Sequence, residues 1–238
     1  MEKTMHNHSS EFAVSNFVSL EAQLERCLDY IPFITPNLTV VSPKFIPLIL
    51  ESCSLIDSIF SKLSGKDSER NNLKAYSMKF EEVLELDEKI TLFLPTTLQP
   101  LCPFKGWTKS IPEWWDAYNK LKHDRLNNYQ VASTANAVLS LAGLHQVMAC
   151  NKDFIGPFLR VGWIDTRDTD AIDELGSVAG LGALHPSPPT TIVESKLFAS
   201  PTRENFVRSF DGSYFDIDYE SHGLSNRLRN LLFAHEEW

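Results

Sequence analysis

The chain has 238 residues, with 22 lysines and arginines against 31 aspartates and glutamates and a formal net charge of −9. This length accommodates one large domain or one domain with an appendage. An acidic chain does not attract nucleic acid through its overall field, so any contact with RNA or DNA needs a local basic patch. The chain contains no long apolar run and begins with polar residues, so we expect no membrane span, no signal peptide and a cytoplasmic location.

The four cysteines are widely separated and show no Cys-x-x-Cys spacing; they are Cys27, Cys53, Cys102 and Cys150. Neither a disulfide framework nor a zinc site is expected from that spacing, because both need clustered or regularly spaced cysteines. Free thiols in a reducing compartment are the expectation, and the sequence predicts no metal and no cofactor.

The first half of the chain predicts helices behind a disordered tail at residues 1–17. Apolar residues recur at helical spacing after Ser19, a candidate N-cap. A second helix is expected to begin at Ser42 and Pro43 and to end at Gly65, because Pro suits the first helical position and Gly the C-terminal stop. A third helix is expected over residues 68–87.

The segment at residues 89–112 changes character, because its prolines forbid a long helix and residues 90–94 read as extended. Ser110 and Glu113 match a capping box, which predicts that the next helix starts there. Residues 131–149 form the most apolar helical segment, and its His145 is expected to be a core residue. These segments predict a mainly α fold, a bundle of about five helices over residues 18–150.

Residues 151–238 are expected to form a loop-rich appendage that contains one β-hairpin and a terminal helix. Glycines and prolines gather in residues 156–190. Two aromatic-rich runs at 205–210 and 213–219 flank Asp211 and Gly212, a strong signal for a two-residue hairpin turn.

The segment from Trp114 to Arg125 is the one that points to a function. It combines two adjacent tryptophans with Asn119 and His123, which helical spacing puts on one face, one turn apart. Because successive helical positions are about 100° apart, we expect the two tryptophans to differ in burial, with Trp114 inward alongside Tyr118. Five basic and three acidic residues between Lys105 and Arg125 make this segment positive within an acidic chain.

Residues 118–124 read Tyr-Asn-Lys-Leu-Lys-His-Asp, which resembles the signature of the HEPN superfamily (higher eukaryotes and prokaryotes nucleotide-binding domain). Members are small helical bundles, and many are RNases of defence and toxin systems. The family pattern is an Arg, a polar residue that is often Asn, and then a His that leads into a last long helix. Asn119 and His123 match it, and residues 131–149 match the helix that follows.

The resemblance implies that His123 and Asn119 are catalytic and that RNA or a nucleotide is the partner. His123 would transfer a proton at the 2′-hydroxyl or the leaving oxygen, and Lys120, Lys122, Arg125 and Tyr118 would contact the substrate. A homodimer is also implied, because HEPN proteins commonly dimerise around this motif. The implied activity is that of a metal-independent RNase of a bacterial defence or toxin-related system.

The sequence departs from the family pattern at Tyr118, which stands where the Arg would be. A Tyr cannot supply the permanent cation that phosphate charge needs. The alternative is therefore a non-catalytic helical interaction module or dimerisation domain, in which Trp114, Tyr118 and Leu121 anchor a core and Asp116 pairs with Lys120 on the surface. The sequence leaves open whether the protein is an enzyme.

Overall fold

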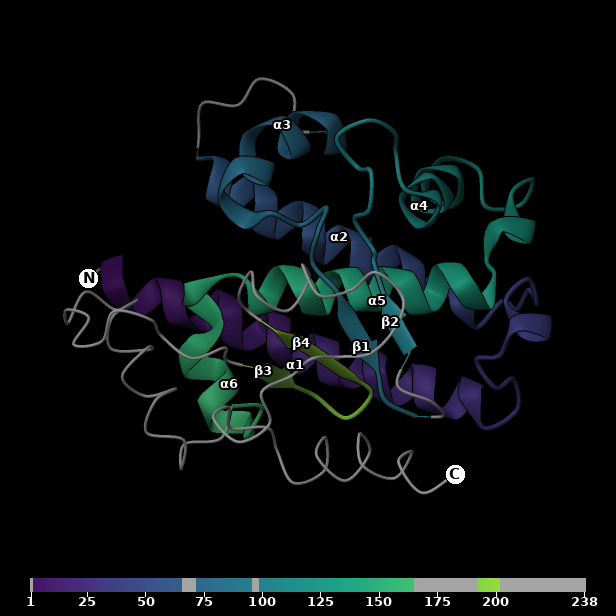
Figure 1. The fold of residues 1–238 in the computed structure, drawn as a ribbon, viewed down its shortest axis with the longest axis horizontal. Coiled ribbons are helices and arrows are strands. Elements are labelled where there is room, and N and C mark those ends of the chain that lie inside the picture. Colours follow the sequence, from purple (N-terminus) through teal and green to yellow (C-terminus); the bar gives the residue numbers. More distant parts are fainter. Residues whose placement is uncertain (1, 66–71, 96–98, 165–191, 202–238) are drawn as a thin grey trace.

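A computed structural model describes residues 2–65, 72–95, 99–164 and 192–201 (Figure 1). The described part is mainly helical with one small antiparallel sheet, as the sequence predicts. Its elements are α1 (Glu2–Leu28), η1 (Thr35–Asn37), α2 (Phe45–Ser64), α3 (Leu73–Leu84), β1 (Thr91–Phe93), β2 (Gln99–Leu101), α4 (Glu113–His123), η2 (Tyr129–Val131), α5 (Thr134–Ala149), η3 (Lys152–Phe154), α6 (Ile155–Val161), β3 (Ile192–Glu194) and β4 (Phe198–Pro201).

Helix α5 is the centre of the bundle. It packs against α2, α1 and α4, and β4 lies against it from the sheet side (Figure 1). Almost every residue of α5 is buried, as its unbroken apolar composition predicts. Ser133 caps the helix, since its hydroxyl accepts a hydrogen bond from the backbone N–H of Asn136.

The sheet joins segments that are far apart in the chain. Its strand order is β2-β1-β4-β3, all neighbours being antiparallel. The β3–β4 hairpin at residues 192–201 pairs with β1 through Leu92 opposite Ala199 and Phe93 opposite Phe198. The hairpin and terminal helix predicted over residues 205–238 lie outside the described residues. The boundary predicted at residue 150 stays a prediction.

The predicted N-terminal tail is wrong for the described residues, because α1 already begins at Glu2. The helix has a reason to extend, since Ala13, Val14 and Phe17 are buried in the same core as Leu20 and Leu24. The N-cap predicted at Ser19 is wrong as well, because its hydroxyl donates to the carbonyl of Ser15 inside the helix.

Other helix ends were predicted with mixed success. Gly65 ends α2 with a φ of 77°, a conformation that favours glycine. The third helix is shorter than expected, running from Leu73 to Leu84. The capping box at Ser110 is wrong: Glu113 is the first residue of α4 rather than the third, and Pro112 occupies the cap position without a side-chain bond.

Candidate functional site

Helix α4 carries most of the predicted site and lies at the edge of the bundle, packed on α2 and α5 (Figure 1). Its charges follow the helix dipole. Glu113 and Asp116 lie in the first turn, and Lys120, Lys122 and His123 lie in the last. Cations stabilise a helix C-terminus, so Lys120 and Lys122 have a structural role there whatever they bind.

The inward face of α4 is aromatic. Trp114 is 1% exposed, and its indole N–H donates a 2.7 Å hydrogen bond to the carbonyl of Pro103. Its ring meets Phe104 edge-on, with centroids 5.4 Å apart. The expected difference between the two tryptophans is wrong, because Trp115 is only 4% exposed. The Trp115 ring meets the rings of Trp114 and Tyr118 edge-on. These two rings cover Trp115, which was expected to lie at the edge of the bundle.

Tyr118 is buried within this aromatic row. Its hydroxyl accepts a 3.2 Å hydrogen bond from Nζ of Lys122, which also lies 5.1 Å from the ring centroid. The hydrogen bond from Lys122 to Tyr118 raises the pKa of the ammonium group, with a smaller contribution from the charge of Asp57. Lys122 is therefore a permanent cation that Tyr118 holds against the helix.

The polar residues of the motif reach the surface. Asn119 is half-buried, and His123, the last residue of α4, is exposed. Lys120 forms a 2.7 Å ion pair with Asp116, which matches the predicted surface pair. Arg125 follows the helix and is exposed. Within the described ranges, the side chains of His123 and Arg125 form no hydrogen bond or ion pair, and both are exposed to solvent.

Two exposed apolar side chains lie close by in sequence, between α4 and α5. Leu126 is 87% exposed, and Tyr129 of η2 is 61% exposed. We call His123, Arg125, Leu126 and Tyr129 the α4 tip. Asp124 lies between them, but its carboxylate is engaged by the backbone and side-chain nitrogens of Asn127. This turn holds the α4 tip in place and fixes the Asp124 carboxylate against Asn127.

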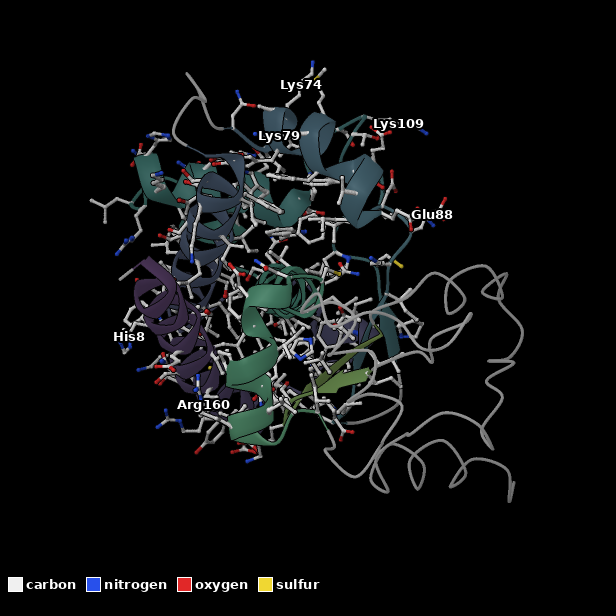
Figure 2. The ribbon with its side chains drawn as sticks, turned by 90° about the vertical axis from the view of Figure 1, so that its left-hand side faces the viewer. His8, Lys74, Lys79, Glu88, Lys109 and Arg160 are labelled. Carbon is white, nitrogen blue, oxygen red and sulfur yellow. The ribbon has the colours of Figure 1, made fainter. Side chains whose placement is uncertain are left out.

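Further lysines lie on α3 and in the loop before α4 but do not make a basic patch. Figure 2 shows Lys74, Lys79 and Lys109 at one end of the molecule, with Glu88 nearby. The ammonium of Lys79 donates to the carbonyl of Ser64. Acidic residues follow Lys74 and Lys79 at the end of α3 and in the loop after it, so the positive charge there is offset.

The sequence motifs missed a buried polar chain around His145. The residue is fully buried, as expected, and its Nδ1 lies 2.8 Å from the hydroxyl of Ser200 on β4. That hydroxyl lies 2.9 Å from Oγ1 of Thr91 on β1. Burial lowers the pKa of His145 from 6.5 to about 3, which keeps the ring neutral. Because no surface reaches it, His145 is a structural residue rather than a catalytic candidate.

Across the described residues, no group of three His, Cys, Asp or Glu side chains is arranged to hold a metal ion. None of the described helices is long and apolar enough to span a membrane.

The chain has no significant similarity to any family model, curated protein or solved structure with which it was compared. The functional argument therefore depends on the geometry of α4 and on the motif that this helix carries.

Proposed function

We propose that the protein is a cytoplasmic, HEPN-like protein that binds RNA or a nucleotide through the α4 tip. The observation that carries the proposal is the exposure of His123 and Arg125, two unpaired donors at the end of the motif helix. Asn119 lies one turn before His123, and the long buried helix α5 follows, which is the order that the HEPN pattern requires.

The chemistry of the α4 tip suits a phosphate-bearing ligand with a base. The negative end of the helix dipole does not favour an anion, so phosphate binding must come from side chains. Arg125 offers a planar fork of donors to phosphate oxygens, and Lys122 adds a second permanent charge. The exposed ring of Tyr129 offers a stacking surface for a base.

Cleavage of RNA would require more catalytic groups at the α4 tip than binding does. RNA cleavage through the 2′-hydroxyl needs one group to accept its proton and another to protonate the leaving 5′-oxygen. His123 can serve one of these roles at a time. A homodimer that brought two α4 tips together would supply both groups, and this is the form in which we propose RNase activity.

The second candidate is a non-catalytic interaction module. It is favoured by Tyr118, which is buried where the HEPN pattern has an Arg, and by the unusually exposed Leu126. Tyrosine and arginine are also enriched at the energetic centres of protein interfaces. In this alternative the α4 tip contacts a protein, and RNA has no specific effect.

The two candidates are separated by measuring RNA binding with a fluorescently labelled single-stranded RNA. We expect Arg125→Gln and Tyr129→Ala to weaken binding several-fold, each through one lost contact. Lys74→Gln is the matched control, because it removes an exposed cation from α3. The same samples run on a denaturing gel show whether His123→Ala abolishes cleavage. It should leave the melting temperature nearly unchanged, since an exposed side chain contributes little packing energy.

Equal affinities for wild type, Arg125→Gln and Lys74→Gln would reject the α4 tip as an RNA site and leave the interaction module. Binding without cleavage would retain the proposal in its non-catalytic form.

A further inference from the structure

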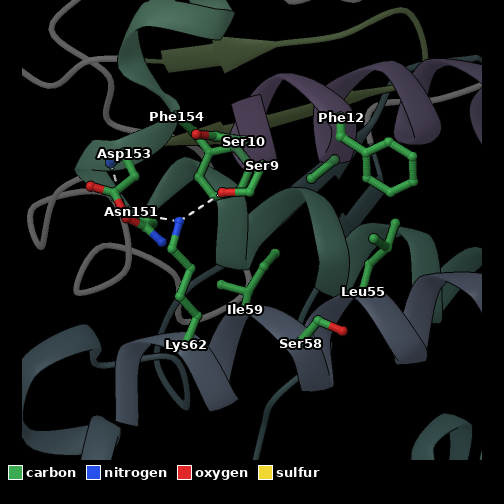
Figure 3. Close-up of a pocket in the computed structure, with 11 residues that line it drawn as sticks. Ser9, Ser10, Phe12, Leu55, Ser58, Ile59, Lys62, Asn151, Asp153 and Phe154 are labelled. Carbon is green, nitrogen blue, oxygen red and sulfur yellow. Dashed lines mark hydrogen bonds and ion pairs between the residues drawn. The ribbon is translucent and has the colours of Figure 1, made fainter. Parts of the chain in front are cut away.

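A separate cavity of about 180 Å³ lies between α1, α2 and η3 (Figure 3). Segments far apart in the chain build it: residues 9–13 of α1, residues 55–62 of α2 and residues 151–154 around η3. None of these residues belongs to the α4 tip. Its volume is below the range typical of pockets for drug-sized ligands, so it suits a smaller molecule.

One part of the cavity is apolar. Ala13, Ile59 and Phe154 are buried, and half-buried Leu55 and exposed Phe12 extend the apolar wall outward (Figure 3). These side chains come from three different elements, so the wall is fixed by the packing of α1, α2 and η3. An aliphatic or aromatic group of modest size would be desolvated here.

The other part of the cavity carries one positive and one negative charge. Nζ of Lys62 donates a 2.8 Å hydrogen bond to the hydroxyl of Ser9 and lies 3.9 Å from Oδ2 of Asp153 (Figure 3). This ion pair is longer than a direct charge-assisted hydrogen bond, about 2.8 Å, so each charged group can still form a direct hydrogen bond with a ligand. The backbone N–H of Asp153 donates to Oδ1 of Asn151, which fixes the turn that carries the carboxylate.

We propose that this cavity binds a small zwitterionic amino acid with an apolar side chain, such as leucine. Its carboxylate would pair with Lys62, its ammonium group with Asp153, and its side chain would lie against Leu55, Ile59 and Phe154. A simple carboxylate would meet the negative charge of Asp153, and a simple amine would meet the positive charge of Lys62. A ligand that carries both a carboxylate and an ammonium group is complementary to Lys62 and to Asp153.

The proposal is tested by isothermal titration of the full chain with L-leucine at millimolar concentrations. We expect saturable binding to wild type. Lys62→Met keeps the aliphatic stem and removes the charge, so it should weaken binding by about tenfold or more, and Asp153→Asn should do the same. Lys120→Met is the matched control, because Lys120 is also an exposed lysine beside an aspartate, on a different helix.

Two probes separate the charges of the ligand. Both 4-methylpentanoate, which lacks the ammonium group, and 3-methylbutylamine, which lacks the carboxylate, should bind much more weakly than leucine. Ser58→Phe places a ring at the cavity from an exposed position and should abolish binding without removing a charge. The melting temperature of each variant shows that it is folded.

The proposal is overturned if wild type shows no saturable binding of leucine, or if Lys62→Met binds as well as Lys120→Met does. Equal affinity for leucine and 4-methylpentanoate would also overturn it, because the ammonium group would then contribute nothing.

Discussion

Acid should destabilise this protein through His145, a fully buried ring that forms no ion pair with a carboxylate of the described residues. Its ring lies among the rings of Phe17, Trp163 and Phe198, and its Nδ1 meets the hydroxyl of Ser200. Burial alone lowers its pKa to about 3. In the unfolded chain the pKa returns to its ordinary value of 6.5, so the unfolded state binds more protons between these values.

The sign and size of the effect follow from this difference. The contribution of His145 to stability is complete above pH 6.5 and is lost as the pH falls toward 3. At about pH 4, proton uptake by this one residue in the unfolded chain costs about 3 kcal/mol of folding free energy. That is a large share of the 5–15 kcal/mol typical of a folded protein.

The measurement is the free energy of unfolding in urea at several pH values for wild type and His145→Asn. Asparagine can still bond Ser200 but does not titrate in this range. We expect the variant to be less stable near neutral pH and the gap to narrow by about 3 kcal/mol between about pH 7.5 and pH 4. His123→Asn, at an exposed position, is the control. Parallel curves for wild type and His145→Asn would refute the reasoning.

Two further predictions concern the aromatic row on α4. Trp114→Ala should lower the free energy of unfolding by about 3–5 kcal/mol, because it empties a fully packed site and leaves the carbonyl of Pro103 without its donor. A loss below about 1 kcal/mol, measured by denaturant unfolding, would contradict this. Gly143→Ala should also destabilise, although alanine favours a helix by about 1 kcal/mol, because its Cβ would lie 3.3 Å from the ring of Trp114. In a Trp114→Ala background the same Gly143→Ala change should become stabilising, and failure to change sign would show that the ring is not the obstacle.

Helices were predictable from the sequence where one stripe of apolar residues faces one core. The five helices expected over residues 18–150 correspond to α1–α5, and Gly65 marks an end because its conformation is local. The extension of α1 to Glu2 was not predictable from polar composition, since Ala13 and Phe17 are buried by partners elsewhere in the chain. The pairing of β4 with β1 likewise depends on contacts that no local pattern contains.

The candidate site was predictable in part. Helical spacing correctly indicated an inward Trp114 and the surface pair of Asp116 and Lys120. The burial of Trp115 was missed because the rings packed against it, Trp114 and Tyr118, are neighbours on its own helix. The cavity around Lys62 was missed because three separate segments build it, and none of them carries a motif.

The sheet also imposes an order of events on synthesis. Strand β1 is completely buried, yet one of its two neighbours in the sheet is β4, and 109 positions separate Thr91 from its partner Ser200. While the ribosome is still making the chain, the helices α1–α5 can collapse early through contacts close in sequence. Until the β3–β4 hairpin has emerged from the ribosome, His145 lacks its partner Ser200 and one edge of β1 lacks its partner strand β4. A nascent chain therefore holds an open strand edge, a surface prone to association with other chains, during the translation of the 109 positions that separate Thr91 from Ser200.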